Sequence, residues 1–294
     1  MGCQMINGME RVAILVDSGT DVPVDIQKKY GMYQISLCIH YTDGDYLDGV
    51  DITPREVYDR FATEIPKTSL PTMEAIQEKF AQIQADGYEK VIVVTISSGL
   101  SGTCQVVHLV AQDFPDLQIH VVDTKNIGIG AGFSAILAAQ LLERGNTFEK
   151  TIELIEGNVA HTKVFFCVDT LEYLRKGGRI GLVAGALGTV LNLKPIISCN
   201  AEGIYYTVAK ARGRANSLKK AIEQATAFAR QYKSCHLAVV NGDAVGEAAE
   251  ITKSMHGLFP EVTHIFEGQI SPALVVHTGP GLIGIGVQRS LVEG

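Results

Sequence analysis

The sequence has few of the groups that bind nucleic acid. It contains no tryptophan, aromatic residues make up 7% of its 294 residues, and the formal net charge is −7. The lysines and arginines are spread along the chain and form no basic stripe. Surfaces that bind nucleic acid gather positive charge on one face and stack bases on aromatic rings, so we expect no nucleic-acid partner.

Long apolar runs and paired cysteines are also missing. No uninterrupted run approaches the roughly 20 apolar residues of a membrane span, and the opening segment MGCQMINGMERV has no signal-peptide core. The six cysteines form no CxxC pair, and most lie in apolar, strand-like segments. We therefore expect a cytoplasmic protein with buried free thiols and no stable membrane insertion.

Motifs for cofactors and nucleophiles fail on inspection. GLSGT lacks the last glycine of GxSxG, and YTDGDYLDGVD has Leu47 where a calcium loop needs its third ligand. The formal GxGxxG at Gly279, Gly281 and Gly284 is too close to Gly294 for the acidic residue that a dinucleotide site needs about 20 positions later. The sequence has no Walker motif or metal-ligand cluster, so we expect no metal and no cofactor.

The order of strand-like and helix-like runs predicts an α/β protein of two domains. Strands and helices alternate over residues 11–160, which is typical of a parallel sheet covered by helices on both faces. Residues 161–294 contain more strands, and the run IISC, NAEG, IYYTV predicts a hairpin. We expect a parallel α/β/α domain at 11–160, a second α/β domain with a mixed or antiparallel sheet at 161–294, and a cleft between them.

Hydroxyl residues follow one predicted strand. KVIVVTISSGLSGT, residues 90–103, predicts a buried strand that ends at Ser97 and Ser98 before a helix. Open sheets bind ligands at the carboxyl ends of strands, and helix amino termini attract anions. KTSLPT, predicted as a loop, adds Thr68 and Ser69, which either belong to the start of the next helix or contact a ligand.

His277 follows the apolar run ALVV, which we expect to be a strand, and stands before Thr278 and Gly279. It is either a structural histidine bonded to backbone or a donor to a ligand oxygen. The other seven histidines lie in no comparable context.

Three arginines stand near glycines. Arg179 follows a short helix predicted in DTLEYLRKGGRIG and suits either a surface salt bridge or an anion or partner contact. Arg212 and Arg214 precede a helix whose expected N-cap is Asn216 or Ser217. Positive charge at a helix amino terminus opposes the macrodipole, so these arginines need a compensating carboxylate, phosphate or acidic partner.

Together these segments resemble the DegV family of fatty-acid-binding proteins, the acyl carriers of the bacterial fatty acid kinase system. The likeness covers nearly the whole chain, through VAILVDSGTDVP, KTSLPT, ISSGLSGT, VDTKNIGIGAG, DTLEYLRKGGRIG, LNLKPII, KARGRANSLKK and HTGPGLIG, in the family's order. Leu70 and Thr72 depart from the family's TSQPS loop, in which Gln and Ser stand at these positions.

The resemblance implies a long-chain fatty acid in a tunnel between the two domains. Its carboxylate would be held by Thr68, Ser98 and His277, and Arg179 with Arg212 or Arg214 would contact the kinase that phosphorylates it. Our candidate ligand groups are thus Thr68, Ser69, Ser97, Ser98, His277 and Thr278. The chain would be a carrier and not an enzyme.

Two alternatives remain. Because the family resembles subunits of dihydroxyacetone kinase, the chain could be a phosphotransferase or hydrolase of a small hydroxylated substrate, with His277 or Ser98 as nucleophile. It could also be a regulatory subunit that senses lipid supply.

Overall fold

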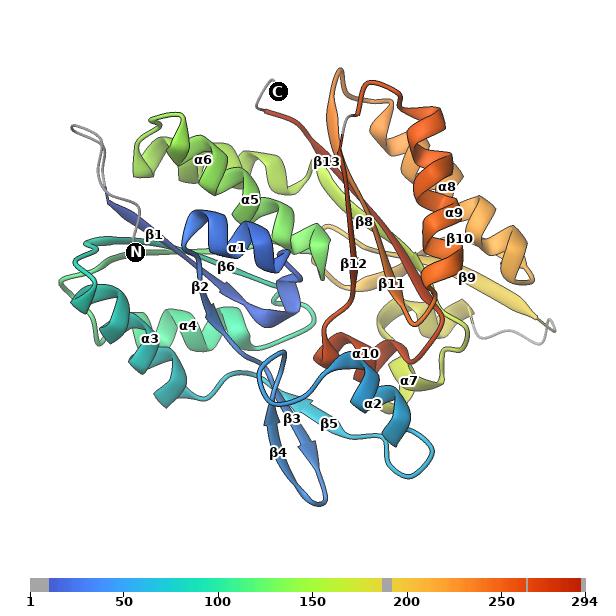
Figure 1. Ribbon diagram of the computed structural model, residues 1–294, viewed down its shortest axis with the longest axis horizontal. Helices are drawn as coiled ribbons and strands as arrows, with labels where there is room; N and C mark the ends of the chain where they lie inside the picture. Colours follow the sequence, from blue (N-terminus) through green and yellow to red (C-terminus); the bar gives the residue numbers. More distant parts are fainter. Residues whose placement is uncertain (1–10, 187–191, 263, 292–294) are drawn as a thin grey trace.

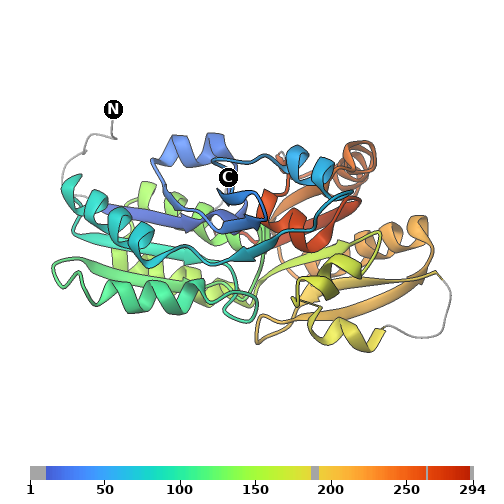
Figure 2. The same cartoon turned by 90° about the horizontal axis from the view of Figure 1, so that it is seen from below.

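The computed structural model describes residues 11–186, 192–262 and 264–291 and contains two large sheets and a small one (Figure 1). Figure 2 shows the halves that carry the two large sheets side by side along the long axis. The sheets meet the expectation of a two-part α/β fold. The chain passes from the half with the first large sheet to the half with the second after α6, which ends at Val159, and before β8, which begins at Thr162. The domain limits 11–160 and 161–294 stay a prediction.

The first large sheet is parallel throughout. Its order is β2-β1-β6-β7, formed by Tyr33–Ile35, Val12–Asp17, Lys90–Thr95 and Gln118–Asp123. Because strand residues alternate between faces, Ala13 and Leu15 pack toward α3 (Met73–Ala85) and α4 (Thr103–Ala111), while Ile14 and Val16 pack toward α5 (Ile129–Glu143). The helices α1 (Val24–Tyr30) and α6 (Phe148–Val159) complete this half.

The second large sheet is mixed, as expected. Its order is β10-β9-β8-β13-β11-β12, formed by Tyr205–Arg212, Leu193–Cys199, Thr162–Cys167, Leu282–Arg289, Cys235–Gly242 and Ile265–Gln269. Only β11 and β12 pair in parallel, and the predicted hairpin is β9 with β10. One face is covered by α8 (Arg214–Ala229) and α9 (Val245–Leu258).

The other face of the mixed sheet packs against α5, which is apolar nearly all round, as the sequence indicated. Ile129 and Phe133 of α5 lie against Gly286 of β13, where a β-carbon would come within 3.0 Å of the Phe133 ring. One continuous core therefore joins the two sheets through α5.

The segment YQISLCIHY, residues 33–41, reads as one strand-like run in the sequence but forms two strands. β2 ends at Ile35 and belongs to the parallel sheet, whereas β3, Cys38–Tyr41, pairs with β4 (Gly44–Leu47) and β5 (Lys67–Ser69) in a separate antiparallel sheet. Between them the Leu37 N–H donates to Ser18 Oγ at 3.0 Å, which takes the backbone out of both ladders. KTSLPT is therefore a strand at its start and not wholly a loop. The β3–β4 hairpin projects from the body of the molecule (Figure 1).

Thr72 caps α3 as expected, since its side chain accepts from the Ala75 N–H. Two secondary-structure predictions were wrong, one of a strand and one of the residue at which a helix begins. ALVVH is not a strand but α10, Pro272–Thr278, which has proline in its first turn. The start of α8 is Arg214, with Gly213 at the cap, so Asn216 and Ser217 lie inside the helix. Short helices α2 (Pro54–Arg60) and α7 (Glu172–Lys176) lie beside α10, and a 3-10 turn covers Gly181–Ala186 (Figure 1).

Cys38, Cys104, Cys167 and Cys199 are buried free thiols, Cys235 is a partly buried one, and Cys3 lies outside the described residues. The expectation of buried thiols is confirmed for the four. In the described part of the chain, no helix combines the length and the apolar character needed to cross a membrane.

Candidate ligand pocket and its polar end

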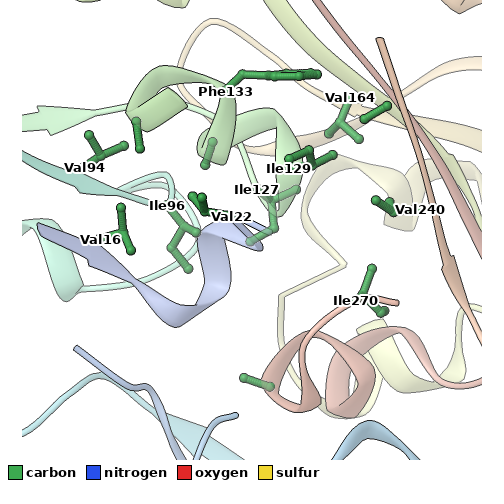
Figure 3. Close-up of a cluster of buried hydrophobic side chains, with 14 of the residues drawn as sticks. Val16, Val22, Val94, Ile96, Ile127, Ile129, Phe133, Val164, Val240 and Ile270 are labelled. Atoms are coloured by element: carbon green, nitrogen blue, oxygen red, sulfur yellow. The ribbon is translucent and has the colours of Figure 1, made fainter. Parts of the chain in front are cut away.

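An apolar pocket lies where the two large sheets meet through α5, and the space along its walls, including solvent at its mouth, is about 770 Å³. Figure 3 shows aliphatic side chains of its wall, which come from both halves of the chain: Ile96, Ile127, Ile129, Val164, Val240 and Ile270. Phe166, Leu274 and Leu282 add to this wall. Both halves of the chain therefore contribute to one apolar wall.

Thr68 and His277 form a hydrogen-bonded pair in the pocket wall. Thr68 Oγ1 lies 2.6 Å from His277 Nε2, and both residues line the pocket. Thr68 comes from β5 and His277 from α10, which pack together. The sequence paired these residues through the resemblance alone; the fold brings them into contact.

His277 is neutral at physiological pH. Burial and, to a lesser extent, the positive charge of Arg179 together lower the pKa of His277 to about 3. The His277 Nδ1 atom has no hydrogen-bond partner among the described residues and faces Gly177, where any β-carbon would overlap the ring. Glycine at 177 is thus required for the histidine to occupy this position.

Arg179 also lines the pocket and is partly buried. It donates to the Gly177 carbonyl oxygen at 2.9 Å and forms no ion pair with a carboxylate in the described part of the chain. The expected surface salt bridge is therefore not formed. Its remaining N–H groups make it the cationic group at the polar end of the pocket.

Ser69 and Thr278 line the pocket too, but their hydroxyls are engaged elsewhere. Successive strand residues point to opposite faces, so Thr68 turns to His277 while Ser69 Oγ lies 2.8 Å from His40 Nε2. Thr278 Oγ1 donates to the Leu274 carbonyl oxygen at 2.9 Å. Thr68 is thus the hydroxyl that the fold joins to His277.

Ser97 and Ser98 do not line this pocket, although Ser98 lines the adjoining one together with Ser101 and Arg179. That both serines contact the ligand stays a prediction. Ser97 is fully buried, donates to the Gly203 carbonyl oxygen and accepts from the Gly99 N–H. Ser98 Oγ accepts from Lys125 Nζ at 2.9 Å. Ser101, three positions further along the same motif, lines the pocket instead. The conformation of the turn after β6 determines which of these serines faces the pocket. The residue types in the motif do not predict that conformation.

Arg212 and Arg214 also lie outside the lining and differ from each other. Arg214 donates to both carboxylate oxygens of Glu247, at 3.1 and 2.6 Å, so its compensating anion lies within this chain. Arg212, at the end of β10, is exposed to solvent.

Three buried carboxyls support the start of α10 and the turn after β1. Asp21 accepts from the Ser271 N–H at 3.1 Å, and Asp48 accepts from the Ala273 N–H at 2.9 Å. Asp17 accepts from the Ile96 N–H at 2.8 Å. Burial raises the pKa of Asp17 to about 7, that of Asp48 to about 6, and that of Asp21 well above its ordinary value. The first third of the chain thereby fixes the helix that carries His277.

Sequence analysis missed His40. Its Nδ1 lies 2.7 Å from Asp45 Oδ1, and its Nε2 lies 2.8 Å from Oγ of the pocket residue Ser69. These contacts of His40 form because β3 lies between β4 and β5, and no local sequence pattern predicts that pairing.

The fold and the pocket define a two-sheet α/β protein with an apolar pocket between the sheets and a hydroxyl, an imidazole and a guanidinium in its wall. Residues 11–290 match the family described as "Uncharacterised protein, DegV family". The chain belongs to the DegV family, as the resemblance indicated.

Relatives and solved structures agree with this assignment. A DegV domain-containing protein of Clostridium acetobutylicum is 39% identical over 277 residues, which cover 94% of this chain and 98% of the relative. The DegV family protein of Thermus thermophilus, described by its fatty acid binding, matches with a TM-score of 0.90 and 29% identity over 95% of this chain and 100% of that one. A stearic-acid-binding protein of Eubacterium ventriosum matches with a TM-score of 0.86 and 28% identity over 95% and 98%.

Proposed function

We propose that this protein binds one long-chain fatty acid in the apolar pocket and presents its carboxylate to a partner kinase, which forms the acyl phosphate. The observation that carries the proposal is an apolar pocket with Thr68, His277 and Arg179 in its wall. The fatty acids bound by the relatives from Thermus thermophilus and Eubacterium ventriosum support the same ligand class.

Burial of the acyl chain would supply most of the affinity. At roughly 0.8 kcal/mol per buried CH₂, a chain of about 16 carbons gains on the order of 12 kcal/mol before ordering costs. This is enough to retain a ligand without a covalent bond. The lining residues Ile129, Val164 and Val240 offer no polar side-chain group that such a chain would leave unpaired.

The polar end would orient the carboxylate. With its proton on Nε2, neutral His277 donates to Thr68 Oγ1, and the Thr68 hydroxyl proton is then free to donate to a carboxylate oxygen. Arg179 adds positive charge beside this oxygen. A carboxylate held in this way keeps an oxygen open toward a second protein.

A kinase would supply ATP and its metal ion, and Arg212 offers it an exposed cation. Arg214 is the weaker candidate for this contact because its guanidinium already donates to Glu247. Thr68, Ser69, His277 and Thr278, with Ser101 and Arg179, are our proposed residues at the ligand; Ser97 and Ser98 support the loop beside them.

Native mass spectrometry of the purified protein, followed by denaturing extraction, tests the carrier. We expect one long-chain fatty acid per chain and, with a fatty acid kinase and ATP, its conversion to an acyl phosphate. An empty protein, or a bound polar metabolite that the protein turns over alone, would favour the small-substrate enzyme. Of the nucleophiles suggested for that enzyme, Ser98 Oγ accepts from Lys125 Nζ, and His277 Nε2 is bonded to Thr68.

A further inference from the structure

Ser69, His40 and Asp45 form a hydrogen-bonded chain across the small sheet. Ser69 Oγ lies 2.8 Å from His40 Nε2, and His40 Nδ1 lies 2.7 Å from Asp45 Oδ1. His40 and Asp45 are direct cross-strand partners on β3 and β4, and Ser69 is one diagonal step away on β5. Three strands thus place a hydroxyl, an imidazole and a carboxylate in line.

The carboxylate decides the tautomer of His40. An ionised carboxylate only accepts hydrogen bonds, so His40 Nδ1 carries the proton and donates to Asp45. In the neutral ring Nε2 is then an acceptor, and it receives the Ser69 hydroxyl proton. A nucleophile, a base in contact with it and a third group that orients the base are the parts of an activated serine.

The serine of this chain has access to both the pocket and solvent. Ser69 lines the apolar pocket and is partly buried, whereas the side chains of His40 and Asp45 are 37% and 75% exposed. An acyl group whose tail fills the pocket can therefore bring its carbonyl carbon to Ser69 while its leaving group stays outside.

We propose that Ser69, with His40 as general base and Asp45 as its positioning residue, hydrolyses activated long-chain acyl esters or thioesters. This proposal rests on acyl binding in the pocket as proposed above. Ser69 Oγ attacks the carbonyl carbon and its proton passes to His40 Nε2. The bond to the leaving oxygen or sulfur then breaks, and His40 protonates that atom.

Water completes the cycle. It attacks the acyl-serine carbonyl and gives a proton to His40, and the bond to Ser69 Oγ breaks as this proton returns to the serine. The products are the free fatty acid, which stays in the pocket, and an alcohol or thiol. No oxidant, metal or further reactant enters the balance.

The test uses p-nitrophenyl palmitate as the oxygen ester, palmitoyl-CoA as the thioester and p-nitrophenyl acetate as an ester without a tail. We expect turnover by the wild type, lost in Ser69→Ala and reduced at least about 100-fold in His40→Ala. Asp45→Asn should lower kcat with little change in KM, because its amide can turn an N–H toward Nδ1 and favour the wrong tautomer of His40. The His120→Ala variant is the matched control and should keep wild-type rates, since His120 pairs with Glu156 at 2.8 Å at similar exposure without a serine.

Diisopropyl fluorophosphate, which needs no acyl pocket, separates this proposal from the one on which it rests. Labelling of Ser69, weakened by His40→Ala, with no fatty acid in the native protein would support the activated serine and overturn the carrier. Retained fatty acid with an unlabelled Ser69, or turnover unchanged in His40→Ala, would overturn the hydrolase. Free palmitate should inhibit the palmitoyl substrates and spare the acetate ester; equal inhibition of both contradicts use of the pocket.

Discussion

Thr68 Oγ1 and His277 Nε2 lie 2.6 Å apart although 209 positions separate the two residues in the sequence. One sits on the small sheet and the other on α10, and both line the apolar pocket. The contact joins the beginning and the end of the chain at the place where a ligand head group would lie.

Replacing His277 by alanine should separate ligand orientation from ligand retention. Thr68 loses its partner, so the carboxylate is held less firmly, while the apolar wall is untouched. Loss of a hydrogen bond to a charged group corresponds to roughly a 10- to 100-fold lower rate of kinase-dependent phosphorylation. Fatty acid retention, measured by extraction, should fall much less. Equal losses of retention and phosphorylation would contradict this division.

Filling the pocket should shorten the bound chain. Val164 of β8 is in the pocket wall and buried, so Val164→Phe adds several carbon atoms to a space that the ligand uses. We expect extracted fatty acids from this variant to be shorter by a few carbons than those from the wild type. The thermal unfolding midpoint shows whether the fold is kept; an unchanged acyl length in a folded variant would place the chain elsewhere.

The two arginines near the start of α8 should have opposite roles. Arg214→Ala removes two hydrogen bonds to Glu247 and should lower the free energy of unfolding by about 1–3 kcal/mol. Arg212→Ala, at an exposed site, should change it by less than about 0.5 kcal/mol. Urea unfolding measures both.

In kinase-dependent phosphorylation, Arg212 should matter more than Arg214, because Arg212 is the exposed cation. Arg212→Glu should slow phosphorylation of bound fatty acid, whereas Arg230→Glu, an exposed arginine just after the far end of α8, should not. Equal slowing by both variants would indicate a general charge effect and no docking contact at Arg212.

The buried carboxyls should make stability fall as pH rises. The pKa of Asp17 is raised from an ordinary 3.8 to about 7, so the folded protein holds a proton that the unfolded chain releases. This contribution is fully present below pH 4 and is lost as pH rises toward about 7; a shift of this size corresponds to the order of 4 kcal/mol.

The measurement is urea unfolding of the wild type and Asp17→Asn at pH 5 and pH 7.5. The neutral amide cannot titrate, so the variant should lose less stability between the two pH values than the wild type does. Other carboxyls, such as Asp123 beside Lys125, have a lowered pKa and act in the opposite direction, which is why the difference between the two proteins is the quantity to compare. The same pH dependence of stability in both proteins would show that Asp17 does not contribute to it.

Much of the fold was predictable because its signals are local. The apolar run before Ser97 predicted the buried strand β6, and the alternation of strands and helices over residues 11–160 predicted the parallel sheet. The split of residues 33–41 and the helical state of ALVVH were not predictable from local pattern. Backbone groups there are satisfied by the distant side chains Ser18, Asp21 and Asp48.

The candidate site shows the same division. Thr68 and His277 were chosen by resemblance, and the fold places them together. Ser97 and Ser98 were chosen because hydroxyls follow a strand, but a turn directs them to Gly203 and Lys125. His40 gave no signal because its contacts with Asp45 and Ser69 depend on which strands flank β3.

The anchoring of α10 by Asp21 and Asp48 has a consequence for the order in which the protein matures during synthesis. Asp21 and Asp48 are synthesised early, and the backbone N–H groups that they accept from, those of Ser271 and Ala273, follow 225 or more residues later. Until that point the growing chain lacks α10 and β13, which supply Leu274, His277 and Leu282 to the pocket wall. A nascent or truncated chain therefore has an incomplete pocket, and the wall closes only when the last strand has been made.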